Sequence, residues 1–168
     1  MIEEARAAGV ERIVAIGVGR ESSESAVALA DAHPGVFAAV GVHPNDADGF
    51  TDDDIAWMRA LAAHPKVVAL GECGLDYFRD HARPANQERA FRAQIALARE
   101  TGLPLVIHTR TADEDCQRIL EDEMGKGAFK AVLHCYTGGR ELAMRAIELG
   151  LSISFTGIIT FKNSQNLR

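Results

Sequence analysis

The chain alternates between short apolar runs and longer amphipathic stretches. The apolar runs are rich in Val, Ile and Leu and do not alternate with polar residues; they occupy 12–18, 36–42, 67–70, 104–107, 131–133 and 151–155. Runs of this kind are typical of strands that are buried on both faces, as in parallel sheets. They predict six strands.

The stretches between these runs predict helices. Thr51 precedes three aspartates, a pattern that favours a capped and acidic helix start. Residues 111–114 have the spacing of a capping box and predict a second helix start at Thr111. Gly9, Gly102 and Gly150 each stand between a helical stretch and the next apolar run, where C-terminal caps are expected.

Strands that alternate with helices predict parallel βαβ units with right-handed crossovers. The architecture is then either an open doubly wound sheet or a barrel. The Gly17-x-Gly19 turn after the first strand lacks the third glycine of a dinucleotide-binding turn and is only a weak signal. An eight-unit β/α barrel needs about 250 residues. The chain of 168 residues therefore predicts an α/β fold with one partial, TIM-barrel-like domain over 1–168, holding roughly six of the eight units.

Composition narrows the setting. The sequence contains no apolar run as long as the roughly 20 residues of a membrane span, and the first residues do not resemble a signal peptide. Three cysteines without a CxxC pair are expected in a reducing cytoplasm. The net charge of −6 disfavours a broadly basic nucleic-acid surface, although bound divalent cations can hold phosphates locally.

Chemistry-bearing residues close four successive predicted strands: His43, Glu72, His108 and His134. The carboxyl ends of barrel strands form the face that carries active sites, so these side chains are expected to look into one cavity. Strand alternation places Leu70 and Glu72 on the inner side and Cys73 on the outer side. The same alternation groups Val106 with His108 and Arg110, and Val132 with His134 and Tyr136, leaving Cys135 outside.

Two imidazoles and a carboxylate are ligands of hydrolytic metal ions, with water in an open position. A cation held by Glu72, His108 and His134 would lower the pKa of that water towards about 7 and create a nucleophile. A carboxylate such as Glu72 can also bridge two metals, which suits phosphodiester cleavage. One ion, or two bridged by Glu72, is expected, of Zn²⁺ or a related hydrolytic type.

Each assignment has a structural alternative. Glu72 can simply be paired with Arg110, and a single buried histidine is more often a hydrogen-bonded core residue than a ligand. His43 precedes a proline and can belong to a turn, and Asp76 can either orient a ligating histidine or cap its loop.

Substrate contacts are expected from His43, Arg110 and Tyr77. Tyr77 and Phe78 are the best positions for stacking on bases, with cover of the rim as the alternative.

At these residues the chain resembles the TatD family of metal-dependent deoxyribonucleases. The matching segments occur in the family's order and cover essentially the whole chain: 41–44, 71–76, 87–91, 104–110 with Ala112 and Glu114, 134–138 and 154–157. The resemblance implies a β/α barrel that hydrolyses DNA esters with Mg²⁺ or another divalent ion, commonly as a 3′–5′ exonuclease. It also implies that Glu72 binds or bridges metal and that His108 and His134 are ligands.

Two expected pieces of the family pattern, an early His-x-His and a late Glu-Thr-Asp, do not occur in the sequence. The missing aspartate is the family's expected catalytic and metal-binding residue. We therefore expect the 168 residues to be a fragment, without the first and last barrel strands, whose own activity is uncertain.

Three functions compete. The favoured one is a deoxyribonuclease that acts on DNA, at single-stranded ends, through Glu72 and a metal-activated water. The second is a metal-dependent hydrolase of another ester or amide, such as an aminoacyl ester on tRNA. The third is an inactive remnant that binds only metal or a partner. No membrane contact and no obligate protein partner are predicted.

Overall fold

The computed structural model describes the backbone of residues 1–168 and every side chain except that of Asn166. Six strands form one parallel sheet whose order follows the chain. They are β1 (Ile13–Ile16), β2 (Val36–Val40), β3 (Val67–Asp76), β4 (Leu105–Arg110), β5 (Ala131–Leu133) and β6 (Ser152–Ile153). All six predicted strands are present. β3 and β4 continue past their apolar runs, so Glu72 and His108 lie inside strands rather than just beyond them.

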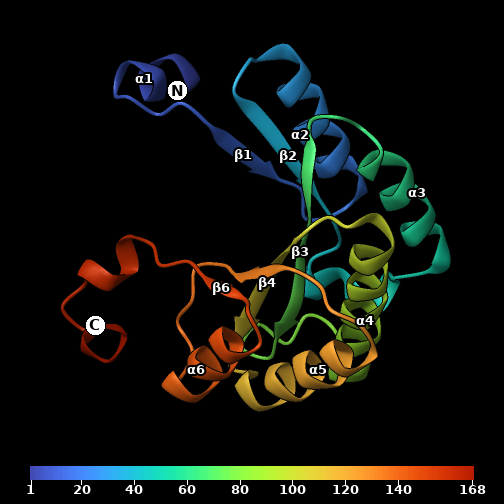
Figure 1. The fold of residues 1–168 in the computed structure, drawn as a ribbon, viewed down its shortest axis with the longest axis vertical. Coiled ribbons are helices and arrows are strands. Elements are labelled where there is room, and N and C mark those ends of the chain that lie inside the picture. The colour runs from blue at the N-terminus through green and yellow to red at the C-terminus, as the bar shows by residue number, and fades with distance from the viewer.

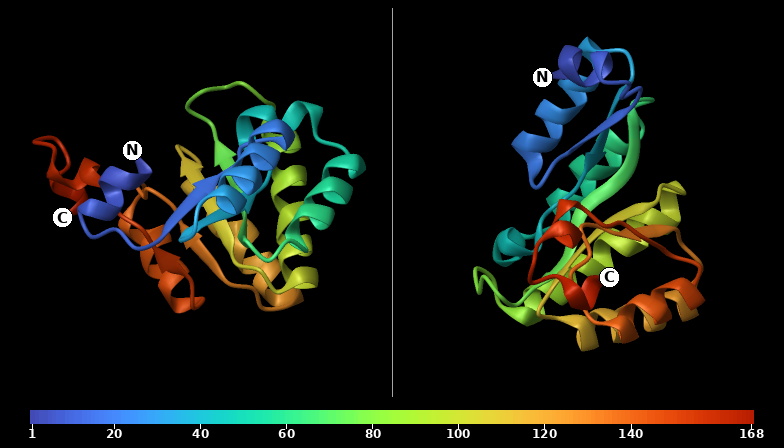
Figure 2. Two further views of the ribbon diagram at one scale, coloured as in Figure 1. Left: turned by 90° about the horizontal axis from the view of Figure 1, so that it is seen from above. Right: turned by 90° about the vertical axis from the view of Figure 1, so that its left-hand side faces the viewer.

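One short helix precedes the first strand, and five helices connect each strand to the next. They are α1 (Ile2–Ala7), α2 (Arg20–Ala32), α3 (Asp52–Ala62), α4 (Pro84–Thr101), α5 (Asp113–Lys126) and α6 (Arg140–Glu148), with 3₁₀ turns η1 (Pro44–Gly49), η2 (Gly157–Thr160) and η3 (Gln165–Leu167). Figure 1 shows α3, α4 and α5 along one side and both chain ends on the other. The left view of Figure 2 shows the same division.

The sheet is not closed. Within the described chain, β1 and β6 each pair with one neighbour only, so they form the two edges of the sheet. Six parallel strands in chain order, joined by crossover helices, are the arrangement of a β/α barrel rather than of a doubly wound sheet, in which the order reverses. The predicted incomplete barrel is confirmed.

The two faces of the sheet differ in what they pack against. Leu70, Cys73 and Ile107 belong to the large apolar core between sheet and helices. Ala39, Ala69 and Val106 form a small cluster on the inner face, against which Ile16 and Val132 pack. The inner positions therefore come from successive strands and form a layer of the kind that fills barrels.

This division confirms that Cys73 faces the helices and Val106 faces inward, but it contradicts the inner position predicted for Leu70. The pairing of β3 with β4 shifts register between Leu70 and Cys73. Such an irregularity interrupts the two-residue alternation, so Leu70 and Glu72 do not share a face. Tyr136 likewise packs in the helix-side core, because the strand ends at Leu133 and Cys135 turns the chain at φ 48°.

Local helix signals succeed in part. Thr51 is the N-cap of α3, and its backbone N–H donates to Asp54 Oδ2 at 2.7 Å. The capping box predicted at Thr111 is wrong: Ala112 is the N-cap, and Thr111 has a φ of 55°. Gly9, Gly102 and Gly150 adopt positive φ after their helices, as predicted.

Glycines let the strands approach closely beside the site. A Cβ on Gly74, whose φ is +127°, would collide with the carbonyl oxygen of His108. A Cβ on Gly41 would meet the backbone of Gly71 on the neighbouring strand. Both contacts lie next to residues that carry the chemistry, so the glycines fix how near β2, β3 and β4 run there. No helix in the described chain is both long enough and apolar enough to cross a membrane.

Candidate metal centre

Three side chains from neighbouring strands converge at the carboxyl ends of the sheet. His43 follows β2, Glu72 lies on β3 and His108 lies on β4. One ligand atom from each lies within 4.8 Å of the others. The parallel order of β2, β3 and β4 produces this convergence, because their carboxyl ends reach the same edge.

His108 stands between two carboxylates. Its Nδ1 lies 3.2 Å from Glu72 Oε1, and its Nε2 lies 3.0 Å from Asp76 Oδ2. Asp76 is fully buried and also accepts hydrogen bonds from the backbone N–H groups of Phe78 and Arg79. Asp76 therefore contacts the ring of His108 and also accepts hydrogen bonds from the loop that follows it.

The charges in this cluster reinforce one another. Burial opposes ionisation of Glu72, but the hydrogen bond and charge of His108, with smaller contributions from His43 and His134, hold its pKa below the usual value. Burial also opposes protonation of His108, yet Glu72 and Asp76 raise its pKa. The two carboxylates therefore favour the protonated form of the His108 ring, and each lies beside one of its ring nitrogens.

These donors fit a divalent ion. When His108 donates its Nε2–H to Asp76, its Nδ1 is free to bind a cation. Nδ1 of His108 and Oε1 of Glu72 then form a neighbouring nitrogen–oxygen pair of ligand atoms. A carboxylate–histidine pair of this kind is the usual support for a metal-ligating imidazole. The Glu72 and His108 side chains are 16% and 21% exposed, which leaves an opening for an ion and a substrate.

His43 has a different chemical role. Its Nδ1 accepts a hydrogen bond from the backbone N–H of Asn45 at 3.1 Å. Burial, and then the nearby His108, lower the pKa of His43, which favours the neutral ring. A neutral ring that accepts at Nδ1 carries its proton on Nε2. His43 thus offers the centre a donor rather than a lone pair, and it also caps η1 as the turn residue that its proline suggested.

His134 lies beside this group but outside it. Its backbone N–H donates to the carbonyl of Ile107, which places it next to His108. Its Nε2 lies 3.2 Å from Cys135 Sγ, so this nitrogen faces the thiol. Among the described residues, the three ligand atoms that lie within 4.8 Å of one another come from His43, Glu72 and His108, not from His134. Cys135 is half-buried beside His134 and does not pack wholly against the helices as expected.

The predicted substrate residues are spread around the rim. Arg110 is exposed, and its guanidinium carbon lies 4.1 Å from the centroid of the Phe78 ring. The Tyr77 hydroxyl donates to Asp115 Oδ2 at 2.8 Å. The ring of Tyr77 is therefore tied to α5, whereas Phe78 is 63% exposed. Glu72 therefore contacts His108, whereas Arg110, its alternative partner, contacts Phe78.

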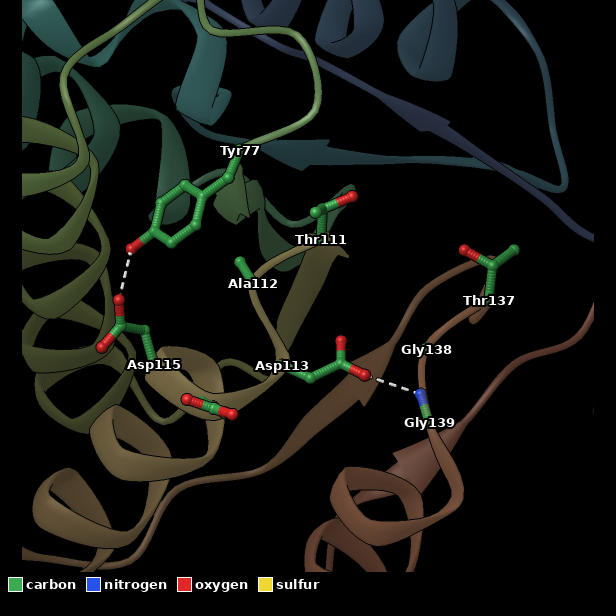
Figure 3. Close-up of a pocket in the computed structure, with 9 residues that line it drawn as sticks. Tyr77, Thr111, Ala112, Asp113, Asp115, Thr137, Gly138 and Gly139 are labelled. Carbon is green, nitrogen blue, oxygen red and sulfur yellow. Dashed lines mark hydrogen bonds between the residues drawn. The ribbon is translucent and has the colours of Figure 1, made fainter.

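One cavity adjoins the centre, and a second cavity shares Thr137 with it. One, of about 430 Å³, is lined by both strand-end histidines and their neighbours: His108, Thr109, Arg110, His134, Cys135, Thr137, Ile158 and Phe161. The other, of about 600 Å³, contains Tyr77, Thr137 and the acidic residues Asp113, Glu114 and Asp115. Figure 3 shows this second cavity, with Asp113 accepting from the backbone N–H of Gly139 and Asp115 held by Tyr77. The first cavity carries the imidazoles and is the one suited to metal chemistry.

Two buried glutamines of α4, Gln87 and Gln94, contact the backbone around the centre and were not singled out as site residues from the sequence. Their signal in the sequence is a pair of amides seven residues apart on the same stripe as the buried Phe91 and Ile95. A polar side chain on an apolar stripe needs a buried partner.

Comparison with known proteins identifies the family. A model of the family described as TatD related DNase matches residues 1–168. The chain belongs to this family.

Relatives agree with this assignment. The chain is 44% identical over 165 residues to an uncharacterized metal-dependent hydrolase, YabD, of Bacillus subtilis, covering 98% of the chain and 64% of that protein. It is 42% identical over 158 residues to a protein of Musicola paradisiaca named 3′-5′ ssDNA/RNA exonuclease TatD, covering 94% of the chain and 60% of that protein.

A solved structure of a TatD homologue, YJJV of Escherichia coli, superposes with a TM-score of 0.85 at 28% identity, over 95% of the chain and 61% of its own length. The chain thus spans about three fifths of the TatD-family proteins it matches.

Proposed function

We propose that this TatD-family chain carries the metal-binding half of a hydrolase that cleaves phosphodiester bonds at the 3′ end of single-stranded DNA. The observation that carries the proposal is the line Asp76–His108–Glu72, with contacts of 3.0 and 3.2 Å. The name of the Musicola relative supports a single-stranded nucleic acid as substrate. The free thiols Cys73, Cys116 and Cys135 support a reducing, cytoplasmic setting.

Each residue has a role in the proposal. Glu72 and Nδ1 of His108 would hold one or two ions, Mg²⁺ or Zn²⁺, with His134 as a further ligand. The bound cation supplies the positive charge that activates water and stabilises the phosphoryl group. His43 donates from Nε2 to a phosphate oxygen. Arg110 and Phe78 contact the single-stranded DNA at the rim of the site. Tyr77 serves through its contact with Asp115 rather than by stacking.

The test compares wild type with Glu72→Ala on single-stranded DNA labelled at its 5′ end, in Mg²⁺, Mn²⁺ or Zn²⁺ and in chelator. We expect loss of a central electrostatic group to reduce the cleavage rate at least about 10²-fold. Glu141→Ala, an exposed glutamate of α6, is the matched control and should cleave normally. Cleavage that survives chelator or the Glu72 substitution would rule out the proposal.

A second substrate class has one observation in its favour. The cavity of Figure 3 places Asp113, Glu114 and Asp115 beside Thr137, which also lines the histidine cavity. Carboxylates there would attract the ammonium group of an aminoacyl ester and repel a phosphate. An assay with aminoacyl esters on tRNA under the same metals separates the two classes. If wild type binds metal but cleaves neither substrate, the chain binds metal without catalysis.

A further inference from the structure

Helix α4 carries two buried amide side chains that reach back to the sheet. Gln87 and Gln94 are each 1% exposed. Their spacing of seven residues puts them on one face, about 10.5 Å apart along the helix axis. Both point at the carboxyl-end edge, where the metal centre lies.

Gln94 holds the segment that leads into His43. Its Oε1 accepts from the backbone N–H of Val42 at 3.0 Å, and its Nε2 donates to the carbonyl of Val42 at 3.0 Å. β2 has ended at Val40, and although the backbone N–H of His43 still donates to the carbonyl of Val18 at 3.0 Å, both the N–H and the carbonyl of Val42 bond to Gln94. The amide replaces the missing strand partner of the residue directly before His43.

Gln87 makes the same pair of contacts with Asp76. Its Oε1 accepts from the backbone N–H of Asp76 at 2.8 Å, while its Nε2 donates to the carbonyls of Asp76 and Ala82 at 3.1 and 2.8 Å. Asp76 is the last residue of β3 and contacts His108 through its carboxylate. One side chain therefore clamps the backbone of the residue that orients His108.

The shared geometry is more specific than the satisfaction of buried polar groups requires. Any donor could satisfy a carbonyl, and any acceptor could satisfy an N–H. A primary amide offers both at fixed geometry, so engaging the N–H and the carbonyl of one residue fixes the tilt of its backbone. The direction of the side chain is then fixed as well: that of Asp76 itself in one case, and that of His43, which follows Val42, in the other.

We propose that Gln87 and Gln94 are positioning residues, through which α4 sets the places of Asp76–His108 and of His43 around the metal centre. The inference rests on the proposed function of that centre. The two glutamines are expected to have different effects. Gln87 acts on metal binding through Asp76, and Gln94 acts on substrate binding through His43.

The test substitutes each glutamine by methionine, which has similar size and no amide. ZnCl₂ titration by calorimetry should show Zn²⁺ binding weakened about 10–100-fold in Gln87→Met, the range typical of losing a residue that supports a ligand. Gln94→Met should bind Zn²⁺ within about 3-fold of wild type but raise the KM for single-stranded DNA about 10-fold. Combining Gln94→Met with His43→Ala should add little to the KM effect of either change.

Gln117→Met is the matched control, because Gln117 is a helical glutamine whose amide reaches only Glu121, within α5. It should change neither quantity. Gln87→Glu and Gln94→Glu keep the acceptor and remove the donor, so they are measured if a methionine variant does not fold. Urea unfolding of every variant separates stability from binding.

The outcomes are distinct. Lower stability with unchanged Zn²⁺ affinity and KM in both variants would mean that the glutamines are purely structural, and would overturn the inference. Absence of Zn²⁺ binding by the wild type would overturn the proposed function itself. Wild-type binding that Gln87→Met retains in full would overturn the inference alone.

Discussion

At the scale of the residue, the centre depends on how one imidazole is held. His108 faces Glu72 on one side and Asp76 on the other. The absence of a side chain at Gly74 lets β3 pass close to the His108 backbone. Asp76 is itself tied by Phe78, Arg79 and Gln87. The ring is therefore oriented before any ion arrives, which lowers the cost of ordering it on binding.

Asp76→Asn should weaken Zn²⁺ binding roughly 10–100-fold, because the amide keeps the loop contacts but loses the charge that supports the Nε2 proton. Calorimetric titration with ZnCl₂ measures the effect. Asp53→Asn, at an exposed position of α3, is the control and should bind as wild type does. Unchanged affinity in Asp76→Asn would mean that His108 is held by packing alone.

At the scale of the element, α4 joins the centre to the outer layer. Its inner face carries Gln87 and Gln94, and its outer face carries Arg92 and Arg99, which reach Glu123 of α5 at 2.7 and 2.8 Å. Lys126 also contacts Glu123 at 2.7 Å, and the carboxylate is almost fully buried. The two arginines of α4 fix α5 against α4, and with it the loop that follows His108, while Lys126 contacts Glu123 from within α5.

Burial opposes ionisation of Glu123, but hydrogen bonds from Lys126, Arg99 and Arg92 lower its pKa from 4.5 to about 2. A depressed carboxyl pKa stabilises the fold above the unfolded value, and the contribution is lost as pH falls through the folded value. Glu123→Gln should therefore cost roughly 2–4 kcal/mol at pH 7. The difference from wild type should narrow between about pH 4.5 and pH 2.

Urea unfolding across that pH range measures this difference. Glu141→Gln, on the surface of α6, should track wild type throughout. A Glu123 variant whose deficit stays constant with pH would show that size and packing, rather than charge, make the residue important.

At the scale of the whole molecule, the six parallel strands bring their carboxyl ends to the same end of the sheet. The net charge of the chain is −6. The chain therefore has little general attraction for a polyanion. In the proposed function the cation, with Arg110 at the rim, must supply most of the attraction for phosphate.

Binding of single-stranded DNA should accordingly depend on divalent cations far more than on ionic strength. With one or two phosphate contacts, the slope of log affinity against log salt should be about −1. Fluorescence anisotropy with a phosphorothioate oligonucleotide in Mn²⁺, over a series of KCl concentrations, gives the slope. A slope of several units, or tight binding in chelator, would point to a basic surface instead.

The sequence alone determined the alternation of strands and helices, because apolar periodicity reports burial directly. It also placed Glu72, His108 and His134 near strand ends, and it carried the family pattern. Local rules failed at two positions: the register shift against β4 turned Leu70 towards the helices, and Thr111 adopted a positive φ instead of capping α5.

Only the tertiary structure decided which donors meet. Whether His43 offers a lone pair or a proton depends on the N–H of Asn45, and whether Asp76 supports His108 depends on the pairing of β3 with β4. The clamps of Gln87 and Gln94 depend on where α4 docks. Periodicity describes how each segment meets water and core, whereas a binding site is a set of distances between segments, and packing alone sets those.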